Sequence, residues 1–135
     1  MVTNRVLFDA VSLRVEEYVR ADGSSPYGNW FEGLEPEAAA KVAVAKTRLS
    51  MGNTSNVKWF DGIGEYVIDW GPGYRVYLAK DGHELIVLYG GGTKRRQEVD
   101  IARAKELHAE YKGRKAAARK QAAAPASRPH RKRKR

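Results

Sequence analysis

Apolar residues recur at helical spacing in two parts of the chain, and each part predicts an amphipathic helix with one buried stripe. The first helix begins at Pro36, which suits the first helical position, and ends at Gly52-Asn53. The second begins at about Arg95 and continues past Tyr111. A shorter helical segment is expected over residues 29–34. The inward positions are Ala38, Val42, Ala45 and Leu49 in the first helix, and Ile101, Ala104, Leu107 or His108, and Tyr111 in the second.

Alternation of apolar and polar residues predicts five strands. An edge strand is expected over Leu13–Arg20, and the last two strands are joined by a hairpin at Asp81-Gly82, a strong turn signal. Helices first, then an antiparallel meander and a closing helix, predict an α+β domain with N-terminal helices packed on a small antiparallel sheet. The other expected strands are Val57–Phe60, Gly64–Trp70, Tyr74–Lys80 and Glu84–Tyr89.

The charge divides the chain of 135 residues into two regions. Residues 112–135 hold eleven Lys and Arg and no acid, whereas residues 1–111 carry a net charge of −2. We therefore predict one domain over residues 1–112 and a largely disordered basic tail over 113–135, whose first part can extend the final helix. The tail residues Arg131, Lys132 and Arg133 are candidate nucleic-acid contacts; the alternative is a solubilising end.

Several classes of protein do not fit this sequence. It contains no cysteine, which excludes disulfides and thiolate metal sites, and no apolar run approaches the roughly 20 residues of a membrane helix. No signal peptide begins the chain, so we expect a cytoplasmic protein without membrane contact. His, Asp and Glu show no metal-ligand spacing, and none of the three histidines is a convincing catalyst. We therefore expect no metal and no cofactor.

Two glycine-rich segments carry the candidate chemistry. Gly71-Pro72-Gly73 predicts a tight turn that presents Arg75 and Tyr77 on one face of the next strand. The second segment, 90–94, places three glycines after an apolar strand and then Lys94, which opens the final helix. A fixed arginine beside a cationic helix start suits a phosphodiester better than a neutral ligand.

RNA cleavage by the 2′-hydroxyl group needs a proton acceptor, charge stabilisation at phosphorus and protonation of the leaving oxygen. Arg75, on a strand face expected to be open to solvent, is the candidate for charge stabilisation; the alternative is an ion pair with Glu65 or Asp69. Tyr77 can share a proton or simply pack in the sheet.

The short strand over residues 57–60 adds Lys58 as a catalytic candidate and Trp59 as a candidate RNA contact. With Lys94, Lys58 joins Arg75 and Tyr77 in the set of candidate catalytic residues. Lys58 precedes Trp59, so a cation is expected beside an aromatic ring that can stack on a base. The alternative places Lys58 at a solvated strand end and Trp59 in the core.

The start of the final helix breaks a local rule. Thr93 suits an N-cap, but Lys94, Arg95 and Arg96 then occupy the first turn, where the helix dipole disfavours cations. A bound phosphate would reverse this preference, which makes the three cations candidate phosphate contacts. The alternative is a helix that begins later, near Gln97, after a solvated loop.

The sequence from about Val15 to Tyr111 resembles the RelE/ParE superfamily of bacterial toxins. The best match is to the HigB-like "addiction module killer" branch. The matching motifs are Trp30-Phe31-Glu32-Gly33-Leu34, Arg48-Leu49-Ser50-Met51-Gly52-Asn53, Val57-Lys58, Gly71 to Tyr77, Gly90 to Lys94, Gln97, Asp100-Ile101 and Ala104.

The resemblance implies the toxin of a type II toxin–antitoxin module, a ribosome-dependent endonuclease that cuts messenger RNA. Its partners would be the ribosome, mRNA and an antitoxin, expected to be a helix-turn-helix protein. The family's phosphate-binding arginine falls on Arg75, and its second basic residue falls near Lys94 or Arg95.

The chain also departs from the family pattern. Tyr66 and Ile68 stand where the best-studied member has two lysines, Ile101 stands in place of a tyrosine, and Val67 stands where HigB-like proteins have an arginine. Two alternatives therefore stay open. One is a ParE-like toxin that binds gyrase without catalysis, and the other is a degenerate nucleic-acid-binding module.

Overall fold

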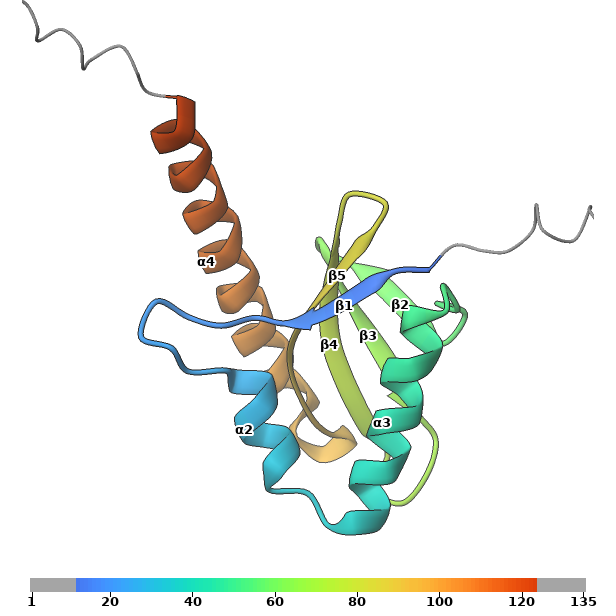
Figure 1. The fold of residues 1–135 in the computed structure, drawn as a ribbon. Coiled ribbons are helices and arrows are strands. Elements are labelled where there is room, and N and C mark those ends of the chain that lie inside the picture. Colours follow the sequence, from blue (N-terminus) through green and yellow to red (C-terminus); the bar gives the residue numbers. More distant parts are fainter. Residues whose placement is uncertain (1–11, 124–135) are drawn as a thin grey trace, which may run out of the picture.

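The computed structural model describes residues 12–123, which form an open five-stranded sheet with helices on both faces (Figure 1). The strand order is β1-β5-β4-β3-β2, so β1 is an edge strand as predicted. Strand β1 runs parallel to β5, whereas every other pair is antiparallel. The strands are β1 (Arg14–Glu17), β2 (Val57–Phe60), β3 (Ile63–Ile68), β4 (Tyr74–Asp81) and β5 (Leu85–Thr93).

The α+β class is confirmed, but the prediction of a wholly antiparallel sheet is wrong at one pair. Two helices, α2 (Pro26–Glu32) and α3 (Pro36–Ser50), separate β1 from β2. The meander then returns β5 to the side of β1 in the same direction. Parallel pairing needs a long connection between the strands, and this sequence supplies one.

The first helical segments follow their local signals. Ser25 has an extended backbone and is the N-cap of α2, since its side-chain oxygen accepts a hydrogen bond from the Gly28 N–H at 3.0 Å. Helix α2 therefore begins at Pro26, three residues before the predicted start. Helix α3 begins at Pro36 as predicted, and its four predicted inward residues are its buried residues. Three of them, Val42, Ala45 and Leu49, pack with residues of α2 and of one sheet face in a core cluster whose other members are Leu13, Tyr27, Tyr66, Val76, Leu78, Ile86 and Leu88.

The opposite face of the sheet is covered by α4 (Gln97–Ala123), which follows a single 3-10 turn, η1 (Lys94–Arg96) (Figure 1). The predicted inward stripe is confirmed, since Ala104 and Leu107 are buried and the other positions are partly buried. This second core cluster contains Tyr18, Ile63, Tyr77, Ala79, Val87, Tyr89, Ala104 and Leu107.

Helix α4 continues well beyond the sheet, so the basic segment over residues 113–123 extends the helix, as one interpretation of the sequence allowed (Figure 1). The predicted boundary at residue 112 therefore falls inside α4. The candidate contacts Arg131, Lys132 and Arg133 lie outside the described residues. Within residues 12–123, no helix combines the length and the apolarity that crossing a membrane requires.

The three glycines over residues 90–92 lie inside β5, whereas the sequence placed them after the strand. A Cβ atom on Gly91 would overlap the Trp30 ring and lie 2.6 Å from the Arg75 carbonyl oxygen. A Cβ atom on Gly92 would overlap the Asp100 carboxylate. Gly91 and Gly92 are therefore required by close packing of α2 and α4 on the strand rather than by a flexible loop.

We expect Gly91→Ala to lower the free energy of unfolding by about 1–3 kcal/mol, because the strand backbone cannot move away from the new methyl group. Gly113→Ala is the matched control. Nothing lies within 4 Å of a Cβ atom at Gly113 in α4, so this change should raise stability by roughly 0.5–1 kcal/mol. Urea unfolding measures both values, and an unchanged Gly91→Ala protein would contradict the packing described.

Candidate functional site

The structure brings the two glycine-rich segments together. Tyr74 is paired with Thr93 and Arg75 with Gly92 across β4 and β5. The carbonyl oxygen of Gly73 accepts one hydrogen bond from the Lys94 backbone N–H and another from Nη1 of Arg75, both at 2.9 Å. One turn carbonyl therefore fixes both the arginine and the start of the cationic turn η1. Gly73 has φ of 79°, which a glycine adopts without strain.

A buried carboxylate lies at the centre of this site. Glu65 on β3 is 1% exposed. Its Oε2 accepts hydrogen bonds from the Tyr77 hydroxyl at 3.0 Å and from Nε2 of Gln97 at 2.8 Å. Nε of Arg75 lies 3.6 Å from the same oxygen. We call Glu65, Arg75, Tyr77 and Gln97 the Glu65 cluster.

The expectation that Arg75 lies on an open strand face is wrong, because the residue is only 9% exposed. The start of α4 covers this face, and Gln97 reaches Glu65 from there. The alternative of an ion pair with Glu65 is confirmed. Arg75 and Tyr77 share one face of β4, as the alternation predicted, since both reach Glu65.

The electrostatics of the site follow from burial. Burial raises the pKa of Tyr77 above its ordinary value, and the hydrogen bond to Glu65 raises it further, so the phenol stays protonated at neutral pH. Burial also raises the pKa of Asp100, although Arg96 opposes this at 3.8 Å. Among the described residues, Nε of Arg75 and Oδ2 of Asp100 are the buried side-chain atoms without a hydrogen-bond partner.

The three predicted phosphate contacts Lys94, Arg95 and Arg96 are all exposed. The prediction that Thr93 caps an α-helix is wrong. Thr93 belongs to β5, and its side chain makes no capping hydrogen bond. The alternative start near Gln97 is confirmed, with η1 in place of a loop. The three cations therefore form a rim beside the buried Glu65 cluster.

Lys58 and Trp59 do not combine as expected. They are neighbours on the edge strand β2, so their side chains point to opposite faces of the sheet. Lys58 lies opposite Glu65 in the register of β2 and β3, and its side chain is exposed. The Trp59 ring covers Gly64, and Trp59 remains 45% exposed. The solvated interpretation of Lys58 is confirmed, and Trp59 is neither in the core nor on the face of Arg75.

Sequence reasoning treated Glu65 only as a partner for Arg75, and it gave Gln97 and Asp100 no role. Each is a polar residue within an amphipathic element, and its position alone did not distinguish it from a solvated one. The signal that could have found Glu65 was its place opposite Tyr77 once β3 and β4 were paired. As a unit, the cluster can hold an arginine, keep a phenol protonated and place both beside an exposed cationic rim.

The fold and site define an α+β domain with a mixed five-stranded sheet and a buried acid–arginine–phenol cluster. No family model and no solved structure matches the chain. The chain is 41% identical over 83 residues to an uncharacterized protein of Haemophilus influenzae, a match that covers 60% of this chain and 84% of the relative. The chain therefore belongs to the same family as that protein.

Removing one partner of the buried pair should cost far more stability than removing both. Glu65→Leu leaves Arg75 buried without a carboxylate, and we expect a loss of about 3–5 kcal/mol. The double variant Glu65→Leu with Arg75→Met should recover most of that loss, because neither charge remains. Chemical unfolding of the single and double variants measures the coupling, and additive losses would contradict a coupled pair.

The raised pKa of Asp100 predicts a pH-dependent effect of Asp100→Asn. The folded protein favours the neutral carboxyl group, so the contribution of Asp100 to stability is full below its unfolded pKa and is lost as pH rises through the folded value. Asn cannot ionise, so the variant should be more stable than the parent at pH 7, and this advantage should shrink towards pH 3. Unfolding free energies across this range measure the difference, and a constant difference would contradict it.

Proposed function

We propose that this chain has a fold of the RelE type and is the toxin of a type II toxin–antitoxin module. The proposed activity is ribosome-dependent cleavage of messenger RNA. The observation that carries the proposal is the Gly73 carbonyl, which holds the Arg75 guanidinium beside Lys94 and the exposed rim. The two segments that resemble the family's motifs, Gly71 to Tyr77 and Gly90 to Lys94, are thereby joined in one site.

In the proposed reaction, a phosphodiester group lies against the rim of Lys94, Arg95 and Arg96. The guanidinium of Arg75 turns from Glu65 towards the phosphate, since the present distance of 3.6 Å is longer than a strong hydrogen bond. It would then stabilise the charge at phosphorus as the 2′-oxygen bonds to phosphorus and the bond to the 5′-oxygen breaks. Solvent water would accept the 2′-hydroxyl proton and protonate the leaving 5′-oxygen. Tyr77 stays protonated and holds Glu65 in place.

A second candidate function is a ParE-like toxin that inhibits gyrase by binding it. The observation that favours it is the burial of Arg75, whose charge is already paired with Glu65. In that case the Glu65 cluster would stabilise the fold, and the rim would contact the partner without any chemistry. The proposed cellular partners are thus the ribosome and mRNA in the first case and gyrase in the second, with a cognate antitoxin in both.

Expression of the chain from a tightly repressed promoter tests the proposal. We expect growth arrest in which protein synthesis stops before DNA supercoiling changes. Lys94→Glu with Arg95→Glu should abolish the arrest, because two exposed rim cations become anions and repel phosphate. Lys41→Glu with Lys46→Glu on α3 is the matched control with the same charge change on the other face, and it should remain toxic.

The order of events separates the two candidates. Loss of supercoiling before loss of translation would favour the gyrase-binding toxin. An unmodified chain that causes no arrest would contradict both toxins and leave the nucleic-acid-binding module. Equal toxicity of the rim variant and the parent would contradict a phosphate contact at Lys94 and Arg95.

A further inference from the structure

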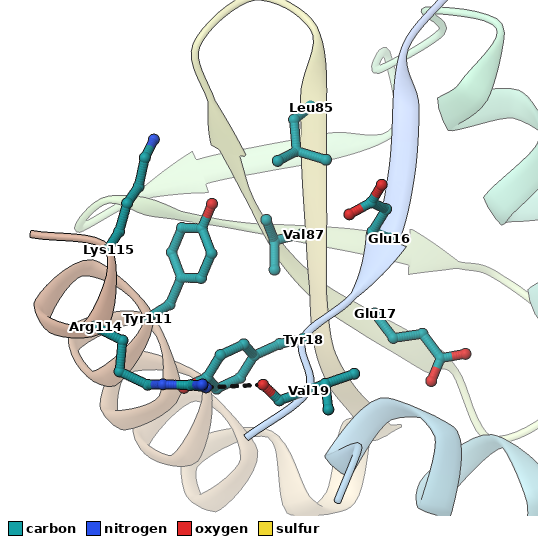
Figure 2. Close-up of a pocket in the computed structure, with 9 residues that line it drawn as sticks. All are labelled: Glu16, Glu17, Tyr18, Val19, Leu85, Val87, Tyr111, Arg114 and Lys115. Carbon is teal, nitrogen blue, oxygen red and sulfur yellow. Dashed lines mark hydrogen bonds between the residues drawn. The ribbon is translucent and has the colours of Figure 1, made fainter. Parts of the chain in front are cut away.

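The outer half of α4 is tied to the sheet by a separate set of polar contacts. Arg114 donates to the Val19 carbonyl oxygen at 2.9 Å and to the Tyr18 hydroxyl at 3.2 Å, across the pocket drawn in Figure 2. Lys115 donates to both oxygens of Asp81 at 2.6 Å, and the Tyr111 hydroxyl also donates to Asp81. Lys115 is therefore paired with an acid, whereas Arg114 is held in place by two neutral acceptors.

A neighbouring pocket of about 300 Å³ lies between α4 and the end of the β4–β5 hairpin. Its one acid is Asp81, whose two oxygens are already taken by Lys115. Within residues 12–123, neither Lys112 nor Arg119 lies within 4.0 Å of a carboxylate oxygen. The pocket is lined by Lys80, Asp81, His108, Tyr111, Lys112, Lys115, Ala116 and Arg119.

The remaining groups of the pocket do not offset the positive charges of Lys112 and Arg119. The Tyr89 hydroxyl and Nδ1 of His108 are hydrogen-bonded at 2.8 Å. Burial, followed by the charge of Lys112, lowers the pKa of His108, so the imidazole is neutral at pH 7. Lys112 and Arg119, seven residues apart on the same face of α4, are the lining cations of this helix that have no ion pair within residues 12–123, and an anion in the pocket would neutralise them.

We propose that this pocket is a second phosphate-binding site, separate from the rim, and that it takes the backbone of single-stranded RNA. The choice of RNA rests on the proposed function, whereas the site itself rests on the pocket. A membrane surface fits poorly, because residues 112–123 offer no apolar side chain larger than alanine. A continuous polyanion fits better, since residues 124–135 add six more cations and no acid.

The two sites are too far apart for one phosphate. Gln97 reaches the Glu65 cluster and Lys112 lines the pocket. Lys112 lies fifteen positions after Gln97, which corresponds to about 22 Å along the helix at roughly 1.5 Å per position. This span corresponds to about six nucleotides at the roughly 3.4 Å rise of a stacked strand. A 12-nucleotide RNA is therefore long enough to contact both sites.

Binding of a fluorescent 12-nucleotide single-stranded RNA to the purified full chain, without ribosomes, tests the proposal. We expect Lys112→Gln with Arg119→Gln to weaken binding about tenfold at 0.1 M salt. The slope of log K against log salt should become shallower by about 1.4, since two phosphate contacts are lost. The matched control is Lys46→Gln with Arg48→Gln on α3, which removes one Lys and one Arg from the other helix layer and should change the slope little.

Equal losses of RNA affinity in the two double variants would overturn the proposed site, because total charge alone would then explain binding. An unchanged slope in the Lys112→Gln, Arg119→Gln variant would overturn it as well. If the unmodified chain binds no RNA, the site is wrong, whereas the toxin proposal is still decided by its own growth assay. If growth arrest fails but the pocket variant loses RNA binding as described, the site holds without the toxin.

Discussion

The buried carboxylate of Glu65 is the constraint on which the rest of this structure depends. A carboxylate that is 1% exposed must be satisfied by neighbouring donors, because burial of an unpaired charge is very costly. The donors come from β4 through Tyr77 and from the first residue of α4 through Gln97, with Arg75 alongside. This requirement fixes where α4 begins over the sheet, and the close approach of the helix is why β5 carries a glycine beneath Asp100.

A second group of contacts holds α4 near the end of the edge strand β1, on the same face of the sheet. Arg20 pairs with Glu110 at 2.8 Å, and this contact, together with the hydrogen bond from Tyr18, lowers the pKa of Glu110 to about 2. Ala104 and Leu107 pack between the two sets of polar contacts. Since the helix is held at both places, its exposed cations keep defined positions relative to the sheet. Cations such as Arg114, which hydrogen-bond to the sheet edge, have a structural role, whereas the exposed cations of α4 can bind a partner.

Structure and proposed chemistry share the same residues at the Glu65 cluster. Arg75 is both a buried partner of Glu65 and the best candidate for a phosphate contact, so binding of a phosphate would compete with an interaction that stabilises the fold. The long Nε–Oε2 distance and the unpartnered Nε atom fit a guanidinium whose internal partners leave it incompletely satisfied. The exposed rim supplies the positive charge that would favour an incoming anion.

The sequence by itself determined the elements whose signals are local. The buried stripe of α3, the bounds of β2 and the hairpin at Gly82 were all correct, because each depends on periodicity or on a turn residue within a few positions. Tertiary structure decided the parallel pairing of β1 with β5, the burial of Arg75, the separation of Lys58 from Trp59 and the glycines inside β5. These features depend on which element lies over which face, and that is set by packing between segments far apart in the chain.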